Sequence, residues 1–504
     1  MYVYMANGSG TYNSRGAAPQ KIEKRLSLST AIDALNSRID NIADELNQGS
    51  GILDLYPDSL MLPKFRQLRN NEYDDDTAIS HCFLFAHVSD CHGGSNTSGS
   101  TTNKTSKSNW QRFISFAKHW SDNGFLDDVV DTGDIVANKQ ANLLDEWRTD
   151  PDDFTKHVKI CIGNHDIANQ GSNGAENTET DQTTRINLPA YTKFIEPNAQ
   201  TWRDEGVVFP DNADTQGKCY YYKDYTKSSE GNRSVTLRAV FLDFMGWGKN
   251  TNTGENPAPA DAQKGWLESV LADALESGFM VCIFMHSAPL GIRKIDCPFS
   301  SASANSLNPQ SQYNSLVFQV ASVVYQFQEQ GGRFVGYFVG HSHRTFIGSL
   351  SGSVTNSVGD TVSLDNAPFQ QLVFVTDNAL MGLSGEYCAH DGLRTPNSPS
   401  HDSFWIIAVN ASGTVKLLKI GFNLDKYMRL RDTVMVRTGS YPSFDPSLTD
   451  YTSGTVVIKD GLLWKILTPV VVPAVGTEGQ PGYVAPYTDW TASDKLPFSR
   501  IVGQ

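Results

Sequence analysis

The stretch over residues 159–166 reads Lys159-Ile160-Cys161-Ile162-Gly163-Asn164-His165-Asp166. Its apolar first half predicts a buried strand, and its Gly-Asn pair predicts a tight turn where that strand ends. The turn presents an amide, an imidazole and a carboxylate at the carboxyl end of a strand, which is where open α/β sheets usually bind ligands. The same residue types are also ordinary turn material, so a functional role depends on what the rest of the chain contains.

Four further stretches repeat this design, in which an apolar run ends in His or Asp. Because side chains alternate along a strand, residues two apart such as Asp90 and His92, or His341 and His343, lie on the same side of an extended strand end. Carboxylate, amide and imidazole ligands without thiolate are typical of Mn, Fe, Zn or Mg sites. Unrelated strand ends with solvated polar tips are the alternative reading. The stretches are Val88-Ser89-Asp90-Cys91-His92, Asp131-Thr132-Gly133-Asp134, Phe284-Met285-His286 and Val339-Gly340-His341-Ser342-His343.

In this order, the motifs D-x-H, G-D, G-N-H-D, a single His and G-H-x-H resemble those of the calcineurin-like metallophosphoesterase superfamily. The resemblance covers about residues 80 to 425. It implies an α/β fold of two face-to-face β-sheets flanked by helices, a four-layer sandwich, with two divalent metal ions (Mn, Fe, Zn or Mg). It also implies a set of ligands: Asp90, His92 and His343 for one metal, Asn164, His286 and His341 for the other, and Asp134 bridging both.

Such a centre implies a phosphoesterase that hydrolyses a phosphate mono- or diester by attack of a metal-bridging hydroxide. His165 follows the predicted ligand Asn164 but is not needed to fill either metal site. We therefore expect His165 to be the general acid, with Asp166 orienting its ring; a hydrogen bond behind the metal ligands is the alternative role. Arg344 is a candidate for binding the substrate phosphate, with a solvent-facing salt bridge as the alternative.

Composition limits the partners of the chain. The net charge of -14 over 504 residues argues against a general nucleic-acid surface. A phosphorylated small molecule or glycan remains an expected substrate, because bound metals reverse the local field. No apolar run is long enough to span a membrane, and residues 1–15 lack a signal-peptide pattern, so we expect synthesis in the cytoplasm. The seven cysteines, scattered singly, predict buried free thiols.

Changes in composition and in the pattern of apolar residues along the chain predict three parts. Residues 1–78 are expected to hold a flexible lead, an amphipathic helix over 28–47 and a linker over 52–78. The helix has a short coiled-coil pattern, so docking on its own domain and a homo-oligomer through residues 28–46 both stay open. The resemblance implies a metallophosphoesterase domain over residues 79–425, in which the polar insertion 167–230 is a candidate substrate lid or a solvated loop. Residues 426–504 are expected to form a small β-rich module.

Two other functions stay open. The coiled-coil pattern and the β-rich end suggest a virion-associated or cell-surface attachment protein that retains the fold. Against this, a structural relic would be expected to lose ligands, and all seven predicted ligands are present. The second alternative is a nucleotide-directed nuclease or phosphodiesterase, for which the acidic charge disfavours a long polynucleotide but not a nucleotide.

Overall fold

The structure is a computed structural model, and it describes part of the 504-residue chain. The described residues are 51–69, 82–92, 101–136, 154–163, 166, 195–210, 219–228, 234–243, 258–296, 314–341, 346–365, 367, 369–375, 402–411, 413–421, 434–437, 456–459 and 462–465. Two expectations lie outside them: the lead with its helix over 28–47, and most of the C-terminal module.

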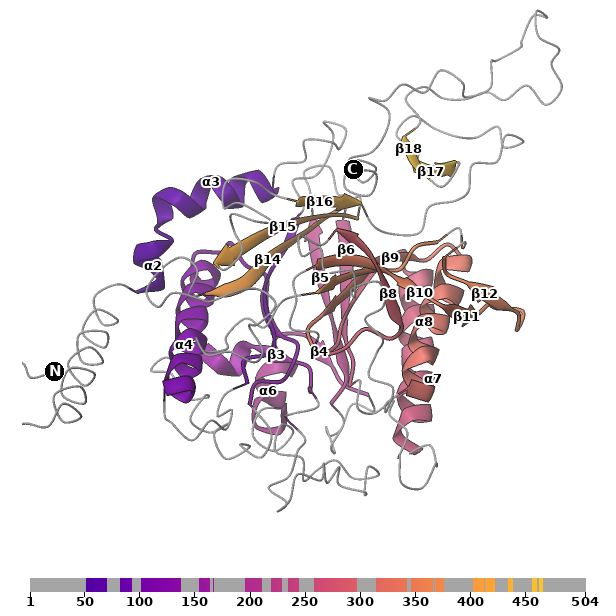
Figure 1. The fold of residues 1–504 in the computed structure, drawn as a ribbon, viewed down its shortest axis with the longest axis horizontal. Helices are drawn as coiled ribbons and strands as arrows, with labels where there is room; N and C mark the ends of the chain where they lie inside the picture. The colour runs from indigo at the N-terminus through magenta and orange to yellow at the C-terminus, as the bar shows by residue number, and fades with distance from the viewer. Residues whose placement is uncertain are drawn as a thin grey trace, which may run out of the picture.

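Two β-sheets form the centre of the molecule, with helices on their outer sides (Figure 1). The six-stranded sheet has the order β16 (Val434–Arg437), β15 (Thr414–Gly421), β14 (Ser403–Asn410), β1 (Cys82–Val88), β2 (Asp128–Asp131), β3 (Lys159–Ile160). The eight-stranded sheet has the order β4 (Val207–Val208), β5 (Tyr221–Ser228), β6 (Ser234–Phe241), β7 (Met280–Phe284), β9 (Arg333–Val339), β13 (Leu372–Val375), β10 (Phe346–Ser351), β8 (Gly291–Asp296). The predicted two-sheet sandwich is confirmed.

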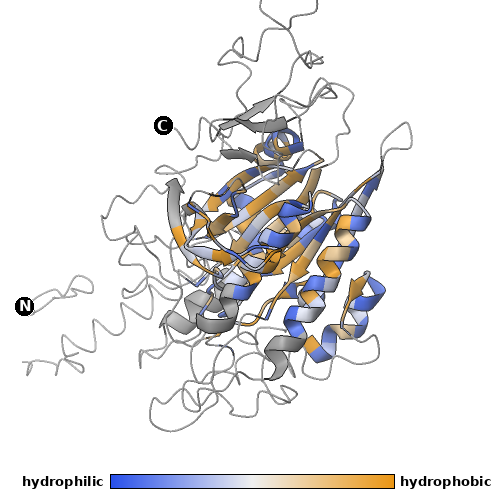
Figure 2. Ribbon diagram, turned by 90° about the vertical axis from the view of Figure 1, so that its right-hand side faces the viewer, coloured by the Kyte–Doolittle hydropathy of each residue, from blue (hydrophilic) through white to orange (hydrophobic). Residues whose placement is uncertain are grey.

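Helices cover both sheets. Helix α4 (Thr101–Asp122) packs on the six-stranded sheet, where Phe113 and Phe116 each place a ring 5.1 Å from that of Phe404 in β14. Helices α7 (Ala258–Glu276) and α8 (Asn314–Glu329) lie side by side against the eight-stranded sheet (Figure 1). Apolar residues concentrate on the strands and on the helix faces turned toward them (Figure 2). None of the described helices is both long and apolar enough to cross a membrane.

Small elements complete the described fold. They are the hairpins β11 (Ser353–Thr355) with β12 (Thr361–Ser363) and β17 (Val456–Lys459) with β18 (Leu462–Lys465), and the short helix η2 (Phe154–His157). The described cysteines are free and buried, as predicted: Cys82, Cys91, Cys161, Cys219 and Cys282.

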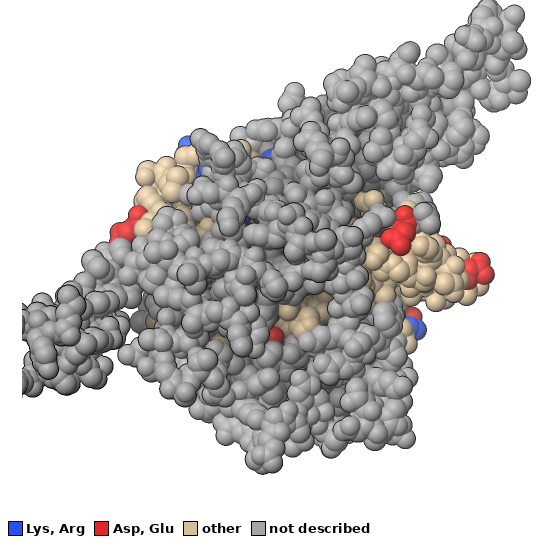
Figure 3. Space-filling view, in the orientation of Figure 1, with Lys and Arg blue, Asp and Glu red and all other residues tan. Residues whose placement is uncertain are grey.

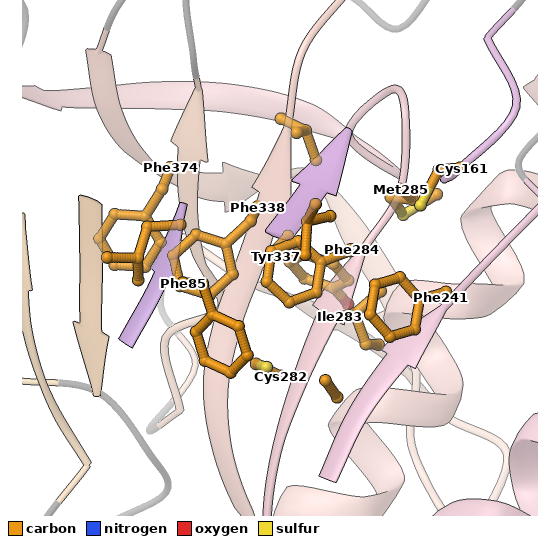
Figure 4. Close-up of a cluster of buried hydrophobic side chains, with 14 of the residues drawn as sticks. Phe85, Cys161, Phe241, Cys282, Ile283, Phe284, Met285, Tyr337, Phe338 and Phe374 are labelled. Atoms are coloured by element: carbon orange, nitrogen blue, oxygen red, sulfur yellow. The ribbon is translucent and has the colours of Figure 1, made fainter. Parts of the chain in front are cut away.

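A ladder of aromatic rings runs across the inner face of the eight-stranded sheet. Neighbouring rings are stacked, with centroids 4.8 to 5.2 Å apart and interplanar angles of 12° to 25°. Offset stacking at such distances is a favoured aromatic geometry. Figure 4 shows four of these rings among the buried side chains. In strand order the ladder consists of Tyr221, Phe241, Phe284, Phe338 and Phe374.

The six-stranded sheet packs directly on this ladder. From β1, the ring of Phe85 lies 5.8 Å from that of Phe284, and the ring of His87 lies 5.8 Å from the same phenylalanine. At one end of the ladder, the Tyr221 hydroxyl accepts a hydrogen bond from the amide of Ile160 and donates one to its carbonyl, both at 2.9 Å. These contacts fix the position of β1 and β3 relative to the opposite sheet.

The prediction of a linker over residues 52–78 is wrong for residues 52–69. Helices α2 (Ile52–Leu55) and α3 (Asp58–Arg69) occupy this segment and add Ile52, Phe65 and Leu68 to the core. Pro63 lies inside α3, where it removes a backbone hydrogen bond but does not prevent the helix. The buried residues Met61, Phe65 and Leu68 have the i, i+4, i+7 spacing of an amphipathic helix, and burial of this stripe stabilises α3 on the sheet.

The prediction of a loop over residues 167–230 is wrong for its second half. Helix α6 (Glu196–Asp204), β4 and β5 lie there, and β5 pairs antiparallel with β6 along its whole length. The aromatic residues Trp202, Phe209 and Tyr221 are core residues, so these parts of the segment are not a lid. Residues 167–194 lie outside the described part of the chain. Similarly, β16 pairs with β15, so the six-stranded sheet extends beyond the predicted domain boundary at residue 425.

Replacing Phe65 tests whether α3 belongs to the core. Its ring lies 4.6 Å from Trp120 and 5.1 Å from Phe125, and it is fully buried. We expect Phe65→Ala to lower the free energy of unfolding by about 3 to 5 kcal/mol. The matched control is Leu60→Ala on the exposed side of the same helix, which should cost about 0.5 kcal/mol or less. Equal denaturation midpoints for the two variants would contradict the docked position of α3.

Candidate metal centre

The predicted ligands follow parallel strands at the middle of each sheet. Strand β1 is parallel to β2 and carries Asp90 just beyond its end, while β2 carries Asp134. In the other sheet β7 is parallel to β9, and His286 and His341 each follow their strand by two residues. Neighbouring parallel strands end at the same edge of a sheet, so the two sheets bring their ligands to a common edge.

A first group of ligands comes from the six-stranded sheet. The side chains of Asp90, His92 and Asp134 are buried, and their ligand atoms all lie within 4.8 Å of one another. His92 Nε2 is 3.7 Å from Asp90 Oδ1 and 3.6 Å from Asp134 Oδ2. Atoms that share one metal at about 2.1 Å lie about 3 Å or more apart, so this spacing suits a cation between them.

A second group combines both sheets and includes the same aspartate. His286 Nε2 lies 3.1 Å from Asp134 Oδ2 and 3.2 Å from His341 Nδ1. The ligand atoms of Asp134, His286 and His341 again lie within 4.8 Å of one another. Asp134 therefore belongs to both groups, and its Oδ2 lies between the imidazoles of His92 and His286.

The orientation of His286 is set from behind the group. Its Nδ1 donates to the carbonyl of Thr132 at 2.8 Å, which leaves Nε2 directed at Asp134. The hydroxyl of Thr132 in turn lies 3.0 Å from Nε2 of His87. Burial lowers the pKa of His87 to about 3, so this ring is neutral. His87 lies outside the predicted motifs, within an apolar run that gives no sign of this contact.

The ligands share an unusual backbone conformation. Asp90, His92, Asp134 and His341 have φ of 57°, 47°, 55° and 67°. Within the described residues they are the non-glycine residues with positive φ. The left-handed region costs an L-residue about 1 to 2 kcal/mol, and such residues concentrate at functional sites.

Glycines allow the ligand loops to touch. A Cβ at Gly163 would overlap the backbone nitrogen and carboxylate of Asp134. A Cβ at Gly340 would overlap Ser89 Oγ and Asp90 Oδ2, and His341 N donates to that same Oδ2 at 2.8 Å. The glycines of the G-N-H-D and G-H-x-H motifs are therefore required by close approach between segments far apart in the sequence.

Comparison with known proteins gives the family of the chain. The sequence profile of the family described as calcineurin-like phosphoesterase matches residues 83–345, which is more than half of the chain. The chain belongs to this family. A search of curated protein sequences found no match. Among solved structures, the 5'-nucleotidase from Candida albicans SC5314 is 18% identical, with a TM-score of 0.30. The match covers 70% of this chain and 51% of that one, so the chain spans about half of its length.

The structure places five of the predicted ligands together. They are Asp90, His92, Asp134, His286 and His341. Asp166, also a predicted site residue, is described and fully buried. The other predicted site residues lie outside the described part of the chain, and their roles stay predictions: Asn164, His165, His343 and Arg344. Cys91, between two ligands, directs its thiol at Asp131 Oδ2 at 3.7 Å.

The side chains gathered at this site fit divalent cations. Imidazole and carboxylate ligands suit Mn, Fe, Zn and Mg. Oδ2 of Asp134 faces the imidazole nitrogens of His92 and His286, at 3.6 and 3.1 Å, which can themselves bind a metal. Burial alone would lower the pKa of His286, but Asp134, Asp90 and Asp166 raise it to about 9. The local field is therefore strongly negative, and a bound cation would reverse it.

A substitution at Gly340 tests the close approach. We expect Gly340→Ala to push the loops apart, to destabilise the fold by about 1 to 3 kcal/mol and to weaken Mn²⁺ binding measured by calorimetry. The matched control is Gly265→Ala within α7, where a Cβ meets nothing within 4 Å. That variant should gain about 0.5 to 1 kcal/mol and bind Mn²⁺ normally. Unchanged stability and affinity in Gly340→Ala would contradict the contact.

Proposed function

We propose that this protein is a metal-dependent phosphoesterase that hydrolyses a phosphate mono- or diester with two divalent metal ions. The observation that carries the proposal is the position of Asp134, whose carboxylate belongs to both groups of candidate ligands. One aspartate with histidines on two sides suits a pair of cations better than a single one. The identity of the ions, from Mn, Fe, Zn or Mg, is left open by the ligand types.

The protein would hold the two ions asymmetrically. Asp90 and His92, with the predicted ligand His343, hold one; His286 and His341, with the predicted ligand Asn164, hold the other. When bound, the ions would neutralise phosphoryl charge and supply a nucleophile at neutral pH. The chain contributes rigidity, since the buried ligands come from strand ends fixed by the core on either side.

The leaving group would receive its proton from His165. In-line hydrolysis breaks the bond between phosphorus and the leaving oxygen, and an alkoxide that leaves without a proton is a poor leaving group. His165 directly precedes Asp166 and follows the predicted ligand Asn164 in the sequence, so its ring is expected near the reacting phosphate. General acid catalysis of this kind is worth about 10² to 10⁴ in rate.

The expected substrate is a phosphorylated small molecule or a phosphorylated glycan. The net charge of -14 argues against a polynucleotide, and Arg344 is proposed to contact the phosphate. The described acidic side chains on the face in Figure 3 lie in small separate groups rather than in one patch. Assembly through residues 28–46 and association with a virion stay predictions.

Turnover of simple esters tests the function, with Asp134 as the critical residue. The Mn²⁺-loaded protein should hydrolyse p-nitrophenyl phosphate, bis-p-nitrophenyl phosphate, or members of a panel of nucleotides and phosphorylated glycans. Asp134→Asn removes the charge shared by both groups, so we expect both metal occupancy and turnover to fall. Two bound metals and full turnover in Asp134→Asn would exclude the bridging role.

A comparison of leaving groups tests His165. His165→Asn should retain its metals, lose about 10² to 10⁴ in rate on alkyl phosphates and lose much less on nitrophenyl esters, whose leaving group scarcely needs a proton. An equal loss on both kinds of ester would show that His165 positions the substrate instead.

A further inference from the structure

The carboxylate of Asp166 holds two ligand loops together. Its Oδ2 accepts hydrogen bonds from the backbone nitrogens of Asp134 at 2.8 Å and Gly163 at 2.9 Å. Its Oδ1 accepts from the backbone nitrogen of Val136 at 3.3 Å. The side chain is fully buried. One carboxylate thus joins the loop after β2 to the loop after β3.

The amides that Asp166 binds flank the aspartate shared by both ligand groups. Asp134 has φ of 55°, a conformation that an L-residue keeps only where its surroundings hold it. The backbone amides of Asp134 and Val136 both donate to the carboxylate of Asp166. This carboxylate therefore holds the backbone on both sides of the Asp134 side chain. Gly163, the third donor, lies so close to Asp134 that a Cβ on residue 163 would overlap it.

We infer that Asp166 is a positioning residue for Asp134, which it holds through the backbone so that Asp134 Oδ2 stays between His92 and His286. This role differs from the one predicted from the sequence, in which Asp166 orients the ring of His165. The inference rests on the proposed function only in assuming that the two groups bind metal. It concerns the affinity of that site rather than proton transfer.

Three backbone amides donate to the side chain at position 166, so both of its terminal atoms must accept hydrogen bonds. An asparagine at position 166 has one acceptor oxygen, and its NH₂ group would face a backbone N–H with no acceptor between them. Because the side chain is buried, water cannot readily replace the lost bond. Asp166→Asn should therefore release part of the loop that holds Asp134 while leaving every metal ligand in place.

Calorimetric titration of the metal-free full chain with Mn²⁺ tests the inference. Loss of a side chain that holds a metal ligand in place typically weakens metal binding by about 10- to 100-fold, and we expect that loss for Asp166→Asn. The matched control is Asp128→Asn, which removes a buried carboxylate at the opposite end of β2, where it accepts from Lys159, Lys223 and Tyr225. The control should lower the thermal midpoint but leave Mn²⁺ affinity unchanged.

Leaving-group dependence separates the two roles of Asp166. If Asp166 positions Asp134, the variant at saturating Mn²⁺ should lose the same factor on alkyl and nitrophenyl phosphates. Normal Mn²⁺ affinity with a loss confined to alkyl phosphates would overturn the inference and assign Asp166 to His165. A wild-type chain that binds none of Mn²⁺, Fe²⁺, Zn²⁺ and Mg²⁺ would refute the proposed function, a result distinct from either.

Hydrogen exchange on the wild-type chain keeps the inference testable if Asp166→Asn does not fold. With residue-level mass spectrometry, the amides of Asp134 and Gly163 should exchange slowly in the metal-free protein, because both donate to a buried carboxylate. Exchange of these amides at the rate of an open loop would show that Asp166 does not hold them, and the inference would fail.

Discussion

The stacked rings that cross the eight-stranded sheet are the contact on which the site depends. His286 lies two residues beyond Phe284, one ring of the ladder, and Asp90 lies five residues beyond Phe85, which packs on that ring. The contact between His286 Nε2 and Asp134 Oδ2, at 3.1 Å, connects the ends of the two sheets. A shift of one sheet against the other would change this distance directly, so the close packing of the core sets the precision of the ligand groups.

The ligand edge is locally costly, and the core offsets that cost. Four residues with positive φ at about 1 to 2 kcal/mol each represent several kcal/mol, against a typical net stability of about 5 to 15 kcal/mol. Close approach adds a second constraint, because Gly163 and Gly340 must lack side chains. The edge is thus organised for the geometry of the predicted ligands rather than for stability, as is common at functional sites.

Much of this arrangement is predictable from the sequence where the signal is local. The apolar runs that end in His or Asp mark β1, β2, β3, β7 and β9, since a strand buried on both faces is a continuous apolar run. Helix α3 is not predicted, because Pro63 is typical of a linker and outweighs the helical spacing of Met61, Phe65 and Leu68. Strand β5 escapes because its lysines look solvent-facing.

Contacts with residues far apart in the sequence explain why strand β5 is not predicted and why Asp166 has a different role from the predicted one. Lys223 and Lys227 of β5 pair with Asp128 and Asp127 of the opposite sheet, at 2.8 and 2.7 Å. A charged residue in an apparent loop thus becomes an inner residue of a sandwich once its partner is known. In the same way, the position of Asp166 beside His165 suggests a side-chain pair, whereas its described contacts are backbone amides.

The two ends of β2 show how the same side chain acquires opposite roles. At the amino end, Asp128 is buried, but Lys159 and Lys223 outweigh the effect of burial and lower its pKa, so it is an ionised structural group. Past the carboxyl end, the carboxylate of Asp134 faces the imidazoles of His92 and His286 instead. Lysines of the chain neutralise the first carboxylate, while the second faces imidazoles that can themselves bind a metal, so a cation can be held between them. The chain therefore separates the end of the strand that stabilises the fold from the end that is suited to bind metal.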